Sequence, residues 1–268
     1  MIHRRGNTHA AIAALSLPLV AAVVCLLGLG VCAAGRFRDQ AQKLPFFVGE
    51  KLTYDVALAS GSRIGQSTMW IEGPTEVRGT TTYLLRFNSR VRVALVTGES
   101  KSESWFDPVR RSSLRYFKHE RSIVTHDDVS VDMYPDQKRW EAKDGSKGAS
   151  PTDSPLDELS FIFFLRTLPL TPGTSHRFDR HFDATRNPVL VNIVRREVTA
   201  TPLGELHTML VEMRVRDPQH YKGEGLIRFN FTDDDCKLPA RIESMMPVVG
   251  KAVMTLRAEN APPECARR

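Results

Sequence analysis

Histidine and aspartate residues are the parts of this sequence with the right chemistry for a metal site. His176 and His181 are five positions apart, and His119 and His126 are seven apart. On a strand, odd spacings place side chains on opposite faces, so neither pair is expected to share a metal ion. The acidic run 233–235 lacks the alternating oxygen ligands of a calcium loop and is predicted to be a turn that binds its own backbone. We therefore predict no metal site and no cofactor.

Motifs for nucleophilic or phosphate chemistry are also missing from the sequence. The segment GSRIG at 61–65 places its serine one position away from that of a nucleophile elbow. No glycine-rich phosphate loop precedes a helix, and no Cys-x-x-Cys pair occurs. Glu50 and Asp55 would be the obvious carboxylates of a hydrolase, but their odd spacing separates them across a strand. We predict no catalytic residues, and an enzyme is the least favoured class of function.

Four cysteines occupy two regions of the chain. Cys25 and Cys32 lie in an apolar N-terminal segment, and Cys236 and Cys265 lie near the C-terminus. Exported domains meet an oxidising compartment in which a free pair tends to close. We predict a disulfide between Cys236 and Cys265; the alternative is that Cys265 sits on a loose tail and never meets Cys236.

The first 35 residues carry the pattern of an export signal. Arg4 and Arg5 precede an uncharged apolar run that is long for a signal peptide and long enough to span a bilayer. Three fates stay open: cleavage near Ala33 or Ala34, retention as a membrane anchor, or lipidation of Cys32. In each case the rest of the chain is exported to the periplasm or cell envelope, with inner-membrane anchoring if the segment is not cleaved.

The remaining chain is predicted to be one antiparallel β domain. Residues 36–46 form a linker, 47–260 the domain, and 261–268 a tail. Leu52, Tyr54, Val56 and Leu58 alternate with polar residues, which is the period of a half-buried strand, and similar short runs recur between turn residues. The predicted fold class is therefore all-β: a curled sheet, half-barrel or β-roll with one central helix, plus a hydrophobic N-terminal helix.

One segment, at about 155–167, has the spacing of a helix instead. Ser154 suits the N-cap, Pro155 the first helical position, and Asp157 would complete a capping box. Pro169 ends the element. The helix is apolar on most sides, so it is expected to be buried, either to plug the open side of the sheet or to gate a cavity.

The formal net charge of +6 is spread along the 268 residues. This mild bias does not predict nucleic-acid binding. Apolar faces are the remaining signal: aromatic residues of the strands and helix could line a hydrophobic cavity or simply fill the core. The candidates for a cavity lining are Tyr54, Trp70, Phe87, Trp105, Phe161 and Phe164.

Three segments together resemble one family. The strand 47–56 (FVGEKLTYDV), the helical segment 157–166 (DELSFIFFLR) and the turn and strand 235–242 (DCKLPARI) are similar to domain-of-unknown-function family 3108. The resemblance implies an envelope location and a curled antiparallel sheet, similar to the half-barrels of periplasmic lipoprotein carriers, and it brings no catalytic residues. In it, Gly49 and Gly65 would allow turns or close backbone approach, Tyr54 would keep its hydroxyl at a rim, and Pro239 would start a strand.

The leading hypothesis is a non-enzymatic envelope protein whose curved sheet binds a lipid or acyl chain. The alternatives are a structural or interaction module of an envelope complex and, less favoured, a hydrolase of envelope polymers. The sequence names no protein partner.

Overall fold

The computed structural model describes residues 44–122, 126–217, 224–246, 250–262 and 265. These residues belong to one compact unit that begins at Leu44. The predicted export segment, with Cys32, lies outside the described residues, as does most of the linker. Among the residues described, no helix is both long enough and apolar enough to cross a membrane.

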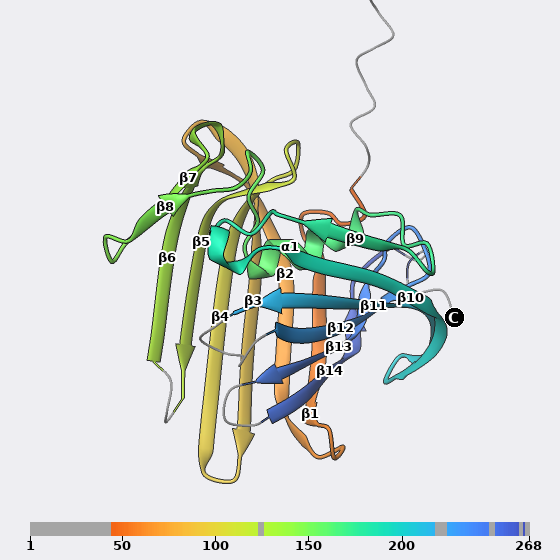
Figure 1. The fold of residues 1–268 in the computed structure, drawn as a ribbon. Helices are drawn as coiled ribbons and strands as arrows, with labels where there is room; N and C mark the ends of the chain where they lie inside the picture. The colour runs from red at the N-terminus through yellow and green to blue at the C-terminus, as the bar shows by residue number, and fades with distance from the viewer. Residues whose placement is uncertain (1–43, 123–125, 218–223, 247–249, 263–264, 266–268) are drawn as a thin grey trace, which may run out of the picture. The chain divides into compact units, whose positions relative to one another are not determined.

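Within these described ranges, fourteen strands form a single sheet in which every neighbouring pair is antiparallel. The sheet curls without closing, and β8 and β9 are its two edges (Figure 1). This confirms the predicted curled all-β class. The strand order is β8-β7-β6-β5-β4-β3-β2-β1-β14-β13-β12-β11-β10-β9. The strands are β1 (Lys51–Leu58), β2 (Arg63–Val77), β3 (Thr80–Val93), β4 (Val96–Asp107), β5 (Ser112–Arg121), β6 (His126–Tyr134), β7 (Arg139–Ala142), β8 (Lys147–Ala149), β9 (Ser175–Phe178), β10 (Val189–Thr201), β11 (Gly204–Arg216), β12 (Glu224–Thr232), β13 (Pro239–Met246) and β14 (Gly250–Glu259).

Bulges and one close backbone contact account for the curl. The register shifts between Val56 and Ala57 in β1 and between Glu72 and Thr75 in β2, and such bulges bend a strand and increase its twist. At Gly65 the backbone of β3 comes so near that an added Cβ would lie 2.1 Å from the carbonyl oxygen of Arg90. Gly65 therefore has the close-approach role that the resemblance implied, and β13 starts at Pro239 as expected.

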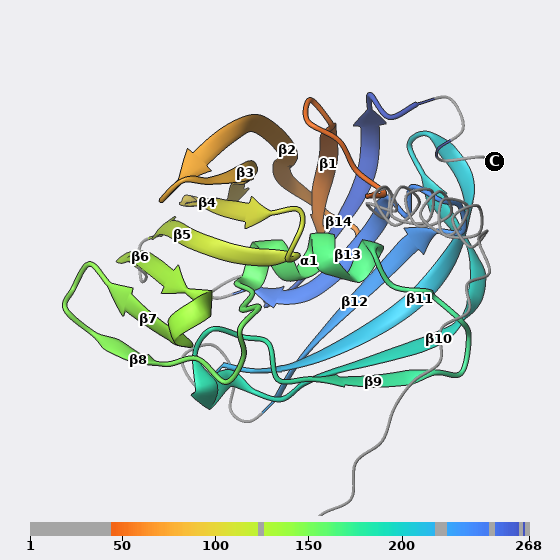
Figure 2. The same ribbon diagram turned by 90° about the horizontal axis from the view of Figure 1, so that it is seen from above.

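The only α-helix among the described residues, α1 (Glu158–Arg166), lies inside the curl. Figure 2 shows it between the wall of β3–β6 and the wall of β10–β13. It buries most of its apolar side chains in the main core, as both the plug and the gate interpretation expected. The buried residues of the helix are Leu159, Ser160, Phe161, Phe163, Phe164, Leu165 and Arg166.

The helix begins three residues later than predicted, and its N-cap is Asp157 rather than Ser154. The Asp157 carboxylate accepts from the backbone N–H groups of Leu159 and Ser160, and the Ser160 hydroxyl accepts from the Asp157 N–H. The residues before it are extended because other segments bind their backbone: the Pro155 carbonyl accepts from the N–H of Ser113, and Leu156 forms a bridge with His181. Tertiary pairing thus overrides the local capping signal.

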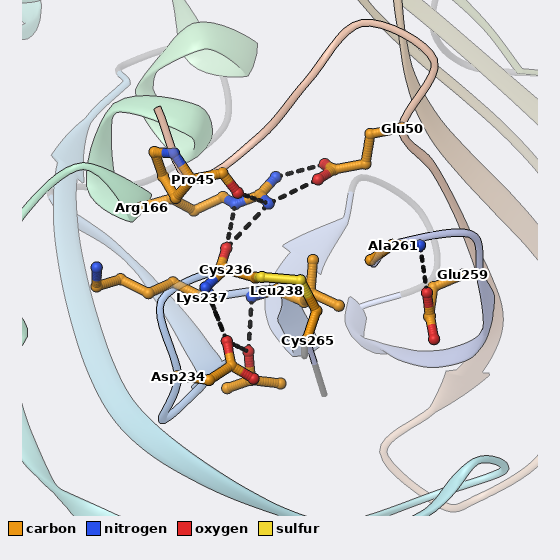
Figure 3. Close-up of a disulfide and its surroundings, with 11 residues drawn as sticks. Pro45, Glu50, Arg166, Asp234, Cys236, Lys237, Leu238, Glu259, Ala261 and Cys265 are labelled. Carbon is orange, nitrogen blue, oxygen red and sulfur yellow. Dashed lines mark hydrogen bonds and ion pairs between the residues drawn. A yellow bond between two sulfur atoms is a disulfide. The ribbon is translucent and has the colours of Figure 1, made fainter. Parts of the chain in front are cut away.

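The C-terminal end of α1 is fixed by Arg166, which is fully buried. Its guanidinium donates to the carbonyl oxygens of Pro45 and Cys236 and pairs with Glu50 (Figure 3). The sulfur atoms of Cys236 and Cys265 are joined in a disulfide, the pair that the sequence predicted. The helix, the start of β1 and the turn before β13 therefore meet at one place.

Candidate functional site

Two rows of side chains run across strands β1 to β6, perpendicular to the strand direction, on the concave face of the sheet. Cross-strand register places their members side by side, so all of them point into the curl. The upper row runs from β1 to β6 through Leu52, Met69, Phe87, Ser102, Lys118 and Val129. The lower row runs through Tyr54, Ser67, Ser89, Ser100, Glu120 and Asp127.

Both rows change from buried to half-buried towards β6. Leu52 and Tyr54 at β1 are fully buried, whereas Lys118 and Glu120 at β5 are half-buried. Phe87 also points into the curl and is half-buried. Solvent therefore reaches the side chains in this part of the concave face.

The facing strands β10–β14 line the curl with apolar residues. Val211, Phe229 and Ile242 are in register with one another and buried. Ile227 and Met254, on the same inward faces, are half-buried. The interior thus has an apolar side and a side rich in serine and charge.

A cluster of ionisable groups lies where the polar side meets the N-terminal end of α1. The Glu158 carboxylate accepts from Arg186 at 2.5 Å, and His181 lies 3.9 Å away. Burial alone would raise the pKa of Glu158, but His181, Lys118 and Arg186 outweigh it and hold that pKa well below its usual range. The second oxygen of this carboxylate, Oε2, is buried and has no hydrogen-bond partner among the residues that the structure describes.

Two further groups of this cluster have shifted pKa values. Burial lowers the pKa of Lys118, but the nearby Glu158 and Glu120 carboxylates outweigh burial and raise it. The pKa of Tyr116 is raised well above its ordinary value by burial and by the Glu158 and Asp157 carboxylates. Lys118 is therefore cationic and Tyr116 neutral at neutral pH, and Lys118 carries its charge on the polar side of the interior, whereas Tyr116 is buried.

A second polar group lies deeper in the core, around Asp157. Ser104 donates to its carboxylate at 2.6 Å, and Ser113 donates to the Ser160 hydroxyl at 2.7 Å. Burial raises the pKa of Asp157 to about 6, against the opposing effect of these hydrogen bonds. All four side chains are buried, so this group fixes α1 to β4 and β5 and is out of reach of a ligand.

The predicted cavity residues divide between the two faces of the sheet. Tyr54, Phe87, Phe161 and Phe164 point into the curl, and all but Phe87 are buried in the core. The hydroxyl of Tyr54 is fully buried and has no hydrogen-bond partner in the described part of the chain, so it is not at a rim as the resemblance implied. Its pKa is raised by that burial.

Trp70 and Trp105 do not line the interior, contrary to the prediction. Both alternate with buried residues and lie on the convex face, where Arg86 and Arg115 cover their rings. The aliphatic chains and planar guanidinium groups of the two arginines shield these aromatic rings from water on the convex face. The rings are therefore stabilised there without being buried in the core.

Among the described residues, no group of three or more His, Cys, Asp or Glu side chains is placed to hold a metal ion. His119 and His126 lie across the β5–β6 hairpin with ring centres 6.1 Å apart, on two paired strands rather than on the single strand that the spacing argument assumed. The acidic run forms the expected turn, in which the Asp234 carboxylate accepts from the backbone of Cys236 and Lys237.

The inward-facing polar residues of β4 and β5, here called the polar wall, are the feature that the sequence analysis did not predict. They are Ser100, Ser102, Ser104, Lys118 and Glu120. Ser100, Ser102 and Ser104 alternate along β4 with charged and aromatic residues, a period-two signal that was present in the sequence. The cluster around Glu158 left no such signal, because Lys118 and Arg186 come from segments far apart in the chain.

One solved structure with a TM-score above 0.5 shows a similar fold at low sequence identity. A beta-barrel-like protein of the domain of unknown function DUF1849 from Brucella abortus is 12% identical, with a TM-score of 0.55, over 81% of this chain and 98% of that one. A protein from Bacteroides fragilis, named as exported and with a YmcC-like fold, has a TM-score of 0.34 at 14% identity, over 81% and 98%. A protein from Parabacteroides distasonis, named as a lipoprotein, has a TM-score of 0.31 at 8% identity, over 81% and 97%.

Among curated proteins, none matches the sequence. A family model does match it, over residues 53–257, which include all of the sheet except the first residues of β1 and the last residues of β14. The chain therefore belongs to the family of proteins of unknown function DUF3108.

Proposed function

We propose that this protein is a non-enzymatic binder that holds a hydrophobic or amphipathic, lipid-like ligand against the concave face of its sheet. The observation that carries the proposal is the partial exposure of side chains that point into the curl. Phe87, Val129, Ile227 and Met254 are apolar, face inward and are half-buried. An acyl chain that covered them would gain about 0.8 kcal/mol for each CH2 removed from water.

The polar wall gives such a ligand one orientation. The half-buried Ser100, Lys118 and Glu120 can bind a head group, while the facing apolar strands contact the chain. The ammonium of Lys118 lies 3.1 Å from the Glu120 carboxylate, so a zwitterionic or hydroxylated head group would find both signs of charge within reach. The site needs no reaction for this role.

We also propose that the protein works outside the cytoplasm. The basic and apolar pattern of residues 1–35 supports export, and the Cys236–Cys265 disulfide suits an oxidising compartment.

The alternative role as an edge-pairing interaction module gains no support from the sheet edges. The edge strands β8 (Lys147–Ala149) and β9 (Ser175–Phe178) are only 3 and 4 residues long, and short edges oppose strand addition.

Native mass spectrometry with lipid extraction, on the protein as an expressing bacterium processes and exports it, tests this proposal. We expect near-stoichiometric lipid, and less lipid in a Phe87→Asp variant because a carboxylate would then face the chain. Val198→Asp is the control, since Val198 is an exposed apolar residue outside the concave site. An empty protein that takes up no lipid on titration, or equal loss of lipid in both variants at equal melting temperatures, would overturn the proposal.

A further inference from the structure

We propose that the tip of the β3–β4 hairpin, with an arginine-lined groove beside it, docks this protein on a membrane surface rich in anionic phospholipid. The hairpin tip consists of Val93, Ala94, Leu95 and Val96. Figure 1 shows this tip at the end of the sheet away from α1. The inference concerns where the protein binds and does not depend on what its interior holds.

The two turn residues of the tip are apolar at a place where neither packing nor turn geometry asks for apolar residues, whereas Val93 below them packs against the small cluster around Val91. Leu95 is 88% exposed. Val93 pairs with Val96, so Ala94 and Leu95 form a two-residue turn, and Ala94 has a φ of 52°. Turns of this kind favour glycine, asparagine or aspartate, which tolerate a positive φ and are polar or small. The Ala-Leu turn thus departs from these preferences, and contact with an apolar phase would remove the Leu95 side chain from water.

A groove of about 530 Å³ lies beside the hairpin, and its charge is positive. Arg63, Arg90 and Arg92 line it, with Glu99 as its only acidic lining residue. Arg90 pairs with Glu99, and Arg63 pairs with Asp55. Arg92 donates to the Ala94 carbonyl at 3.2 Å and has no carboxylate partner within the described part of the chain.

An apolar tip next to arginines is the combination that binds an anionic bilayer surface. The leucine and valines enter the boundary between head groups and acyl chains, while guanidinium groups pair with phosphates at the surface. Each arginine near such a surface shifts the equilibrium between docked and undocked hairpin by about fivefold. A protein partner would have to supply both an apolar pocket and an anionic rim, which a phospholipid surface supplies everywhere.

The other end of the sheet provides a matched control. Val109, in the turn between β4 and β5, is 90% exposed and is followed by Arg110 and Arg111. Arg110 pairs with Asp136, and Arg111 accepts through its carbonyl from Arg180. Val109 therefore shares the exposure and the neighbouring arginines of Leu95 but lies in the turn at the opposite end of β4.

The test is tryptophan fluorescence in the full-length chain, as the expressing bacterium processes it, with vesicles that contain brominated lipid as quencher. Leu95→Trp and Val109→Trp are compared, and the signal of the 3 native tryptophans is subtracted with the parent protein. Vesicles of phosphatidylcholine alone and of phosphatidylcholine with phosphatidylglycerol are used. Near-ultraviolet circular dichroism checks that each variant is folded.

We expect strong quenching of Trp at position 95 in the anionic vesicles, weaker quenching in the neutral vesicles, and little at position 109 in either. Adding Arg90→Gln and Arg92→Gln to Leu95→Trp is expected to shift the docking equilibrium about 25-fold, five for each arginine. Absence of quenching at position 95, equal quenching at positions 95 and 109, or equal quenching in neutral and anionic vesicles would each overturn the proposal.

Discussion

Arg166 and Glu50 form a two-bond ion pair inside the protein, although they are 116 positions apart in the chain. Nη1 of Arg166 lies 2.6 Å from Oε1 of Glu50, and Nη2 lies 2.8 Å from Oε2. Both side chains are almost completely removed from solvent. The rings of Phe46 and Phe163 flank the guanidinium, so the pair joins the end of α1 to the segment before β1 in an apolar setting.

We therefore expect Arg166→Met to lower the free energy of unfolding by about 3–5 kcal/mol, because Glu50 would be left charged and unpaired in the core. Urea unfolding measures this loss. The control is Arg228→Met, which breaks the partly exposed pair with Glu212 and should cost about 0–1 kcal/mol. Equal losses in the two variants would show that burial of the Arg166 pair contributes nothing.

A second prediction concerns the contact that allows the sheet to curl. Gly65→Ala should destabilise the protein by about 3 kcal/mol, since the new methyl group would collide with the β3 backbone at Arg90 and Val91. At Gly98 an added methyl group would meet only the Val91 side chain, at 3.3 Å. Gly98→Ala is therefore expected to change the melting temperature little. Similar melting temperatures for both variants would contradict the close approach.

The pH dependence of stability tests the buried Asp157. Its pKa rises from 3.8 in a free side chain to about 6 in the folded protein. The folded state therefore keeps a proton that the unfolded chain loses first, and this group's contribution to stability falls as pH rises through that interval. By pH 7 the loss reaches up to about 3 kcal/mol.

Asp157→Asn removes this titration and keeps the side-chain oxygen that caps α1. We expect the unfolding free energy of the variant to rise relative to that of the parent protein as pH goes from about 4 to about 7. Urea titrations across this range give the comparison. A difference between the two proteins that stays constant with pH would mean that Asp157 does not titrate there.

The disulfide offers a fourth prediction. Cys236 and Cys265 close a loop with a sequence separation of 29. Replacing both by serine should cost about 3–4 kcal/mol through the added freedom of the unfolded chain. Melting curves with and without reductant measure the effect: reductant should lower the melting temperature of the parent protein and leave that of the double variant unchanged. A parent protein insensitive to reductant, with the bond verified as reduced, would contradict the prediction.

Local patterns in the sequence determined the class of the fold. Alternation at Leu52, Tyr54 and Val56 identified β1 and its buried face, and Pro239 correctly placed the start of β13. The apolar run after Asp157 identified a buried helix. These signals are local because the period of a strand or helix is set by the backbone of a few successive residues.

Only the tertiary structure decided where the helix begins and which face Trp70 and Trp105 occupy. Ser154 had the right neighbours for an N-cap, but Ser113 and His181 bind the backbone just after it and keep the chain extended. In β2 the large apolar residues Met69, Trp70 and Ile71 follow one another, so the alternation of the sequence does not show which of them face the interior. Arg86 on the neighbouring strand covers the ring of Trp70 on the convex face, and this contact exists only in the folded sheet.

The candidate site is likewise a product of the fold. Lys118, Glu158, His181 and Arg186 come together because the curl of the sheet brings β5, α1 and the segment before β10 to one place. No local period links residues at such separations. The sequence by itself therefore determined the strands, the helix and the family, while the contacts between distant segments determined the polar wall, since side chains meet there only after the sheet has curled.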